Sequence, residues 1–403
     1  MQIYRTYADL YRRNLLEDVI PFWQRYSPDP DHGGYFTCLD RTGKVYDTDK
    51  FAWLQGRQAW TFAMLYNRYA QREDWLRTAR AGIEFLNRCG RDPDGSYYFS
   101  LSREGQALTQ AHNIFSDCFA AMAFHEYAKA GRCEASAAAA LAAYRRFEAR
   151  LDHPKGRFDK STGHRPLSAF GLPMMMAYLT YELEPILPGA AVVDRYEACI
   201  DTIFQRHFDP DRGIIREFVA PDGTFSDTFD GRLVNPGHGI EAMWFLMDIA
   251  CRLDRPDLVR QATDCCLSTL AYGWDAAHGG IFYFLDAHGA PPQQLEWDQK
   301  LWWVHLEALV ALSRAYLLTR REDVWEWYRK VHDYTWARFP DPDGGGEWFG
   351  YLNRQGEPLL TLKGGKWKGC FHVPRALFEC WRNFEAIADA DEASFPGTNR
   401  STP

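Results

Sequence analysis

The chain has 403 residues, a formal net charge of −8 and 46% hydrophobic residues. This length suffices for two domains or for one large closed domain with a sizeable core. No block of Lys and Arg stands out, which makes nucleic acid and anionic membranes poor partners. Aromatic residues make up 15% of the chain, a richness that serves packing but also suits a cleft for the flat faces of sugars.

The ten cysteines show no C-x-x-C spacing, and most lie in apolar stretches with helical periodicity. They are typical of small buried side chains in a reducing compartment, and they indicate neither a disulfide framework nor a zinc site. Residues 1–18 are amphipathic and lack the apolar segment of a signal peptide. No run approaches the ~20 apolar residues of a membrane span. The sequence therefore predicts a cytoplasmic protein that does not enter a membrane.

Turns rich in Asp and Gly recur along the chain, beginning with Asp-His-Gly-Gly-Tyr-Phe at 31–36 and Asp-Pro-Asp-Gly at 92–95. Steps of 62, 61, 57, 66 and 65 residues separate their glycines, which are Gly33, Gly95, Gly156, Gly213, Gly279 and Gly344. Between consecutive turns lie roughly 40 to 50 residues with helical periodicity, enough for two helices. A few alternating aromatic residues and a second glycine follow each turn, a pattern typical of a short β-hairpin.

Helix pairs of this kind cannot each bury their apolar faces alone. A closed ring, with the inner helices around a central cleft, solves this problem. The sequence therefore predicts an all-α fold, an (α/α)6 barrel with short β-hairpins at one mouth. We expect a single catalytic domain over residues 1–388 and a disordered polar tail over residues 389–403. An open helical solenoid stays the alternative, because the sequence does not show ring closure.

The first candidate catalytic residue lies in the stretch 235–244, Asn-Pro-Gly-His-Gly-Ile-Glu-Ala-Met-Trp. A turn at Pro236 and Gly237 leads into an apolar run, which places His238 at the mouth of a buried helix. Glu241 follows three residues later on the same face. An imidazole suits proton transfer at neutral pH, and a helix N-terminus favours its neutral form. By itself, such a histidine more often only bonds a loop carbonyl.

A second histidine occurs in the same context near the other end of the sequence. In the stretch 367–375, Pro374 suits the first turn of a helix, with His372 just before it and Arg375 just inside. In a ring of helix pairs, His238 and His372 would open onto one cavity. Two neutral histidines on opposite sides of a cavity suit the removal of a proton from one face of a carbon and its return to the other. The pair is our candidate for the catalytic acid and base.

Two further stretches supply candidate binding residues. Residues 294–307 are predicted to form the fifth inner helix, on which Lys300, Trp303 and Glu307 share one face. A cation, a flat ring and a carboxylate in one stripe suit the binding of a polyol, although an ion pair beside a core tryptophan is an equal alternative. Arg57 lies inside an apolar helix and needs a partner, either a substrate oxygen or a structural carboxylate.

Several motifs strongly resemble the N-acylglucosamine 2-epimerase family. They are Asp-His-Gly-Gly-Tyr-Phe (31–36), Trp-Leu-Gln-Gly-Arg-Gln (53–58), Asn-Pro-Gly-His (235–238), Gln-Leu-Glu-Trp (294–297), Lys-Leu-Trp-Trp (300–303), Gly-Glu-Trp-Phe-Gly-Tyr-Leu (346–352) and Lys-Gly-Cys-Phe-His-Val-Pro-Arg (368–375). The resemblance implies an (α/α)6 barrel, commonly dimeric, that interconverts N-acetylglucosamine and N-acetylmannosamine. Cellobiose 2-epimerases and mannose isomerases are more distant, since they carry an additional histidine where this chain has Leu-Pro-Met-Met-Met at 172–176.

The resemblance also implies roles for single residues. His238 and His372 resemble the acid/base pair of the family. The residues that resemble those contacting the substrate or orienting the histidines are Arg57, Glu241, Glu307 and Arg375. Together with Lys300 and Trp303 of the predicted stripe, and with Trp367, they form the candidate substrate-binding set.

No cofactor is expected to be required, and the resemblance implies ATP as an activator that is not consumed. We expect no metal, because the carboxylates are scattered in the sequence and indicate no metal cluster. The expected partner is a monosaccharide, and the resemblance implies a homodimer. Alternatives are a 2-epimerase of free mannose and glucose, an aldose–ketose isomerase of the mannose isomerase type, a two-carboxylate glycoside hydrolase and a non-enzymatic protein-binding module.

Overall fold

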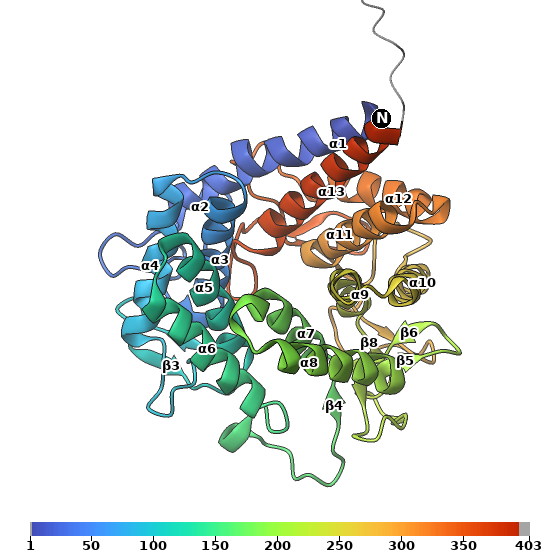
Figure 1. Ribbon diagram of the computed structural model, residues 1–403, viewed down its shortest axis with the longest axis horizontal. Helices are drawn as coiled ribbons and strands as arrows, with labels where there is room; N and C mark the ends of the chain where they lie inside the picture. The colour runs from blue at the N-terminus through green and yellow to red at the C-terminus, as the bar shows by residue number, and fades with distance from the viewer. Residues whose placement is uncertain (1, 395–403) are drawn as a thin grey trace, which may run out of the picture.

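The computed structural model describes residues 2–394, in which inner helices form a ring inside a second layer of helices (Figure 1). The inner helices are α3 (Ala52–Arg68), α5 (Phe115–Gly131), α7 (Gly171–Leu183), α9 (Pro236–Arg252), α11 (Trp302–Thr319) and α13 (His372–Ser394). The outer layer contains α1 (Gln2–Arg13), η1 (Asn14–Val19), α2 (Ile20–Tyr26), α4 (Glu73–Cys89), α6 (Glu134–Ala149), α8 (Gly189–Thr202), η4 (Ile203–His207), α10 (Pro256–Gly273) and α12 (Glu322–Arg338). The predicted (α/α)6 barrel is confirmed.

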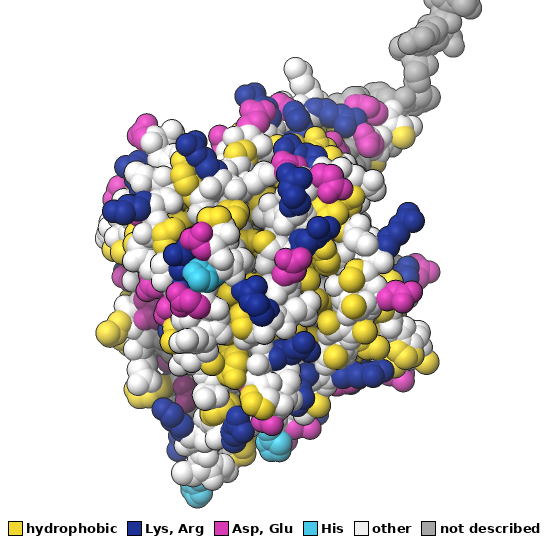
Figure 2. Space-filling model, turned by 90° about the vertical axis from the view of Figure 1, so that its left-hand side faces the viewer, with side chains coloured by type: hydrophobic (Ala, Val, Ile, Leu, Met, Phe, Trp, Pro, Cys, Tyr) yellow, Lys and Arg dark blue, Asp and Glu magenta, His cyan; other side chains and the backbone are white. Residues whose placement is uncertain are grey.

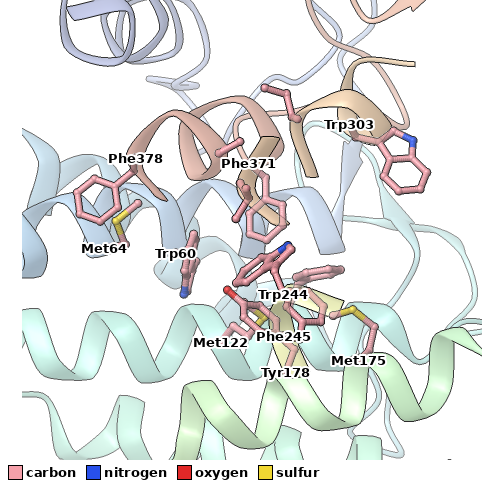
Figure 3. Packing of buried hydrophobic residues seen from close by; sticks show 14 of the residues in the cluster. Trp60, Met64, Met122, Met175, Tyr178, Trp244, Phe245, Trp303, Phe371 and Phe378 are labelled. Atoms are coloured by element: carbon pink, nitrogen blue, oxygen red, sulfur yellow. The ribbon is translucent and has the colours of Figure 1, made fainter. Parts of the chain in front are cut away.

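The distribution of apolar residues decides which helix lies inside. In α5 every residue from Ser116 to Ala128 is buried, and α11 is buried almost as completely. In α4 the buried residues recur at helical spacing on one side, and charged residues occupy the other side. A helix that is apolar all round must be surrounded by other helices, whereas an amphipathic helix can face water on its polar side. Aromatic and methionine side chains of the inner helices fill the interior (Figure 3).

The ring is closed where the last inner helix meets the first. Trp60 of α3 packs against Phe371, just before α13, with ring centroids 5.3 Å apart. Thr61 donates a hydrogen bond of 2.9 Å to the carbonyl oxygen of Cys370. On the outside, α1 lies along α13 (Figure 1), and Arg5 contacts Asp389 at 2.6 Å. This closure excludes the open solenoid.

Short antiparallel strands occupy the loops that lead into the inner helices. They are β1 (Lys50–Phe51), β2 (Ser100–Leu101), β3 (Ala107–Thr109), β4 (Ser168–Ala169), β5 (Phe208–Asp209), β6 (Ile214–Ile215), β7 (Phe218–Val219), β8 (Leu233–Val234), β9 (Leu285–Asp286), β10 (Lys300–Leu301), β11 (Tyr351–Leu352) and β12 (Pro358–Leu360). The sheets have the orders β1-β2-β3, β10-β11-β12, β4-β7, β5-β6 and β8-β9. Because β1, β8 and β10 immediately precede α3, α9 and α11, the strands gather at the mouth where those helices begin, as predicted.

The predicted disordered tail begins too early. Helix α13 continues to Ser394, so residues 389–394 are helical. Asp389 and Glu392 bind Arg5 of α1, and Asp391 binds Arg320 at 3.0 Å, so these ion pairs hold the last turns on the barrel. Residues 395–403 of the predicted tail lie outside the described residues.

The surface agrees with the charge pattern of the sequence. On the face shown in Figure 2, Lys and Arg side chains are interspersed with Asp and Glu side chains. Among residues 2–394, no helix combines the length and the apolar character that a membrane crossing needs. All ten cysteines are free thiols, as the absence of a disulfide framework in the sequence indicated.

Candidate active site

A cavity of about 510 Å³ lies at the N-terminal ends of the inner helices. Every inner helix contributes to its wall, and loop residues from the hairpins complete it. The helical lining residues are Trp53, Arg57, Phe115, Phe119, Gly171, Met174, Met175, His238, Glu241, Trp302, Trp303, His372 and Arg375. Helix N-termini carry partial positive charge and free N–H groups, so this end of the barrel favours a ligand with negatively charged or electron-rich oxygens.

His238 lies in the first turn of α9. The helix begins at Pro236, so the residues predicted to form a turn already belong to it. The side chain of Asn235 caps the helix and accepts a hydrogen bond of 3.3 Å from the backbone N–H of His238. Gly237 allows the helix to approach α11 closely, since a Cβ there would lie 2.6 Å from the ring of Trp303. The start of α9 therefore places His238 in the wall of the cavity.

The Nδ1 atom of His238 faces the carboxylate of Glu217, which precedes β7. The two carboxylate oxygens lie 3.0 and 3.1 Å from Nδ1. Burial opposes the charged imidazolium, but the negative charge and hydrogen bond of Glu217, helped by the charge of Glu241, raise the pKa of His238 above its usual value. The opposite ring nitrogen forms no hydrogen bond within residues 2–394, and 31% of the side chain is exposed toward the cavity. Nε2 is thus free to meet a substrate.

His372 is the first residue of α13 and is held differently. Its Nδ1 lies 2.7 Å from a carboxylate oxygen of Glu307 on α11. The same carboxylate accepts hydrogen bonds from Arg375 at 2.7 Å and from the indole of Trp244 at 2.9 Å. Burial, together with the positive charges of Arg57 and Arg375, lowers the pKa of His372 well below its usual value. His372 is therefore a neutral imidazole at physiological pH.

The structure brings the two histidines to one cavity. The ring of Trp303 is close to both, with centroid distances of 5.2 Å to His238 and 5.8 Å to His372. Because α9 and α13 both pack against α11 and both histidines line this cavity, a small molecule bound there can contact both imidazoles. This is the arrangement that acid/base transfer across a single carbon needs.

Arg375 organises the carboxylates beneath His372. Its Nη2 atom lies 2.5 Å from Glu241 and 2.7 Å from Glu307. These contacts correct the expectation of scattered carboxylates, because ligand atoms of Glu241, Glu307 and His372 come within 4.8 Å of one another. Since the guanidinium of Arg375 binds both carboxylates, it compensates one of their two negative charges within the protein. Arg375, Glu241 and Glu307 thus form a charged cluster that holds His372 in place.

Arg57 has no such carboxylate partner. Its guanidinium carbon lies 4.1 Å from the ring centre of Phe119, 4.4 Å from that of Trp53 and 4.6 Å from that of Phe371. Within residues 2–394 its side chain forms no ion pair and no hydrogen bond, and its Nε is buried without a hydrogen-bond partner. The sequence predicted either a structural carboxylate or a substrate oxygen as the partner of Arg57. Among the described residues no carboxylate pairs with it, which leaves a ligand oxygen as the candidate partner.

Two of the candidate aromatic residues line the cavity at different depths. Trp303 is buried close to both histidines. Trp367 is 54% exposed at the mouth, where its ring lies 5.9 Å from those of Trp53 and Phe99. Helix α7 presents Met174 and Met175 to the cavity at the position where the sequence lacks the additional histidine. One side of the cavity is thus apolar.

Lys300 was expected on the same helical stripe as Trp303 and Glu307, and this expectation is wrong. Lys300 belongs to β10, and α11 begins only at Trp302, so the stretch 294–299 is a loop. The ammonium group is fully buried and binds Asp275 of a repeated turn at 3.1 Å. Extended pairing of β10 with β11 turns this side chain away from the cavity, which it does not line. Lys300 is a structural residue of the mouth.

Sequence reasoning missed Glu217 altogether. It lies 21 residues before His238, beside Arg216 in the connection between the apolar strands β6 and β7, so no local spacing links Glu217 to His238. Only the position of the hairpin over the start of α9 brings them together. Glu307, in contrast, was predicted near the substrate but acts through His372, because it is fully buried and does not line the cavity.

The fold and the cavity together define a barrel enzyme with an acid/base site for a small polar molecule. The chain belongs to the N-acylglucosamine 2-epimerase (GlcNAc 2-epimerase) family, whose sequence model matches residues 34–376.

Individual relatives support the family assignment. The N-acylglucosamine 2-epimerase of Mus musculus is 40% identical over 91% of this chain and 89% of its own length. That of Homo sapiens is 38% identical over 91% of this chain and 87% of its own length. Among solved structures, the cellobiose 2-epimerase from Bacillus thermoamylovorans superposes with a TM-score of 0.81 at 20% identity, covering 94% of this chain and 99% of the other. The last comparison shows the shared fold.

Proposed function

We propose that this protein is a sugar 2-epimerase that interconverts N-acetyl-D-glucosamine and N-acetyl-D-mannosamine. The family and the relatives, which are N-acylglucosamine 2-epimerases by name, support the substrate class. The observation that carries the chemistry is the meeting of His238 and His372 in one cavity, each with its Nε2 free. Two bases are what inversion at one carbon requires.

The proposed reaction begins with the open-chain aldehyde of the sugar, in which the carbonyl group makes the C2 proton acidic. One imidazole removes this proton from one face, and the C–H electrons form an enolate. The unpaired guanidinium of Arg57 stabilises the negative charge that develops on oxygen. The second imidazole then delivers a proton to the opposite face of C2, which completes the inversion.

The buried polar groups position the catalytic imidazoles. Because the carboxylate of Glu307 accepts the Nδ1 proton of His372, the lone pair of that ring is placed on Nε2, toward the cavity. Arg375 fixes Glu307 and Glu241 in turn. Trp303 and Trp367 offer flat surfaces to the sugar ring. Lys300 has no part in the proposed site.

The decisive experiment mixes the protein with N-acetylmannosamine in D₂O and follows the products by NMR. We expect N-acetylglucosamine carrying deuterium at C2, with no ketose. Parallel reactions with free mannose and with a chromogenic glycoside test the related epimerase and the hydrolase. A ketose product would replace the proposal by aldose–ketose isomerisation, and the absence of turnover on every sugar would favour the protein-binding alternative.

We further propose that the enzyme needs no cofactor, that ATP activates it without being consumed, and that it works as a cytoplasmic homodimer. These proposals rest on the family resemblance. Initial rates with and without ATP, phosphate release during turnover and light scattering of the purified protein test them. Release of phosphate in step with epimerisation would contradict the role of ATP as an activator.

A further inference from the structure

The two histidines occupy equivalent places in the barrel but have unequal carboxylate partners. The carboxylate of Glu307 is shared by His372, Arg375 and Trp244. The carboxylate of Glu217, in contrast, has a single hydrogen-bond partner within residues 2–394, which is His238. One carboxylate is thus already compensated by a guanidinium, whereas the other keeps its charge for the imidazole beside it.

The remaining charged groups around each ring strengthen this difference. His372 is faced by Arg57 from α3 and Arg375 from its own helix α13, and by Glu241 and His238 from α9. Glu307 from α11 contacts its Nδ1 directly. Two positive and two negative charges therefore surround it, so no net negative charge remains to stabilise a further proton on this ring.

His238 is faced by Glu217 from the loop before β7, by Glu241 one turn along α9 and by the uncharged ring of Trp303 from α11. Two further titratable loop residues, Tyr283 and Glu296, line the same cavity, and the ring of Tyr283 meets Trp303 edge-on with centroids 6.1 Å apart. Besides His372 across the cavity, the groups around His238 are carboxylates and neutral rings, and a proton on this imidazole finds the compensating charge that His372 lacks.

We propose that Glu217 is a positioning residue that holds the single catalytic proton on His238, so that His372 is the base of the resting enzyme. This inference rests on the proposed two-histidine epimerisation. Glu217 accepts the Nδ1–H of His238, and this hydrogen bond points the second N–H of the ring, on Nε2, into the cavity. The resting site is thereby poised for the epimer whose C2–H faces His372.

The proton balance follows directly. The C2–H bond breaks, its proton moves to Nε2 of His372 and its electron pair remains on the enolate. Nε2 of His238 then gives its proton to the opposite face of C2, and a new C–H bond forms. The enzyme is left with its proton on His372 and a neutral His238. Before the next turnover in the same direction, water carries one proton from His372 to His238.

This assignment makes a prediction for the pH profile. Both working forms of the enzyme contain one proton, so kcat/KM has the same bell shape in the two directions of the reaction. The alkaline limb reports the loss of the proton from His238, and Glu217 sets its position. Removing the charge of Glu217 must move that limb, whereas a purely structural role of Glu217 would lower the rate at every pH equally.

The test compares wild type with Glu217→Gln by NMR titration of labelled histidines, assigned with single His→Gln variants, and by the pH profile of kcat/KM. In Glu217→Gln we expect the midpoint of His238 and the alkaline limb to move down together by about one pH unit or more. Glu217→Asp keeps the charge and restores most of the shift. Asp222→Asn removes an exposed charge in the turn on the other side of β7, which does not contact His238, so it leaves both midpoints in place.

An unchanged His238 midpoint in Glu217→Gln overturns the inference, even if the enzyme epimerises N-acetylmannosamine. Should that variant not fold, the wild-type titration decides, because His238 must titrate above His372 and the reverse order overturns the inference. If instead no sugar turns over, the proposed function fails while the titration still reports on Glu217. The two failures are therefore distinguishable.

Discussion

The two ends of the barrel use charge in opposite ways. At the end of the barrel opposite the cavity, every inner helix contributes to a network of ion pairs, whose members include Arg68, Glu126, Glu182, Asp248, Arg314 and Glu379. Arg68 lies 3.4 Å from Glu182, 3.8 Å from Glu126 and 3.9 Å from Glu379. Arg314 lies 3.1 Å from both Asp248 and Glu379. Each arginine thus ties neighbouring helices together.

At the N-terminal ends, the same helices aim charge into a cavity. Arg57 has no acidic partner within residues 2–394, and Nε2 of both histidines is free of hydrogen bonds to the described residues. Charges that are fully paired stabilise the assembly of helices, whereas charges left facing a cavity are available for a substrate. The same six helices therefore stabilise the closed ring at one end of the barrel and form the candidate active site at the other end.

The largest expected effect tests the cavity end. Replacing His238 or His372 by Ala removes one of the two proton carriers, so we expect epimerisation to fall by about 10²- to 10⁴-fold. The melting temperature should change little, because each imidazole faces a cavity. His278→Ala, in an exposed turn, is the matched control. Normal turnover in either catalytic variant would remove the two-base scheme.

The next effect tests the closed end. Arg68→Ala leaves three carboxylates without their shared cation, and we expect a loss of about 3 kcal/mol in the free energy of unfolding, measured with urea. The value of kcat/KM should stay near that of wild type, because the residue is far from the cavity wall. Arg72→Ala, whose exposed side chain forms an ion pair with Asp74, serves as a control with little effect. A selective loss of activity in Arg68→Ala would contradict the division between the two ends.

A smaller effect concerns pH at the closed end. Burial, with the charges of Glu379 and Glu182, raises the pKa of Asp248 to about 6, although Arg314 opposes the shift. The folded state therefore binds this proton more tightly than the unfolded state, and the resulting stability is lost as pH rises through about 6. Asp248→Asn mimics the protonated form at every pH.

We expect the stability of Asp248→Asn relative to wild type to improve as the pH is raised from about 5 to about 7.5. Urea midpoints of both proteins at the two pH values measure this difference. A relative stability that falls with rising pH would show that Asp248 is stabilised as an anion by Arg314.

The smallest effect is expected at the cavity mouth. Trp367 is 54% exposed, so Trp367→Ala removes only part of the wall for the sugar. We expect KM for the N-acetylated sugar to rise by about two- to fivefold, with kcat little changed, because the ring adds binding area without touching the proton carriers. Leu359→Ala, exposed on β12, is the control. A fall in kcat alone would place Trp367 closer to the chemistry than the structure does.

Much of the fold could be predicted from local patterns. The regular spacing of the Asp- and Gly-rich turns reflects repeated helix pairs, and continuous apolar stretches separate the inner from the outer helices. Local patterns failed where an extended segment resembles a helix. Lys300 has helical spacing to Trp303, but pairing of β10 with β11 delays the start of α11.

The residues of the candidate site likewise include some that local patterns identify and others that they do not. The motifs around His238, His372 and Arg375 could be recognised, because each stands at a helix start whose proline and small residues mark it. The carboxylates that bind the two histidines could not be recognised from local patterns. Glu217 and Glu307 reach the two imidazoles from 21 and 65 residues away, and nothing in their own neighbourhoods indicates it.

The sequence by itself determined the repeated helices, the burial of the inner layer and the presence of two histidines at helix starts, because periodicity and capping are local properties of the chain. Only the tertiary structure decided which carboxylate meets which imidazole, since closure of the ring sets those distances. The electrostatic difference between His238 and His372 arises there, as the ring leaves Glu217 to one histidine and shares Glu307 with Arg375 at the other.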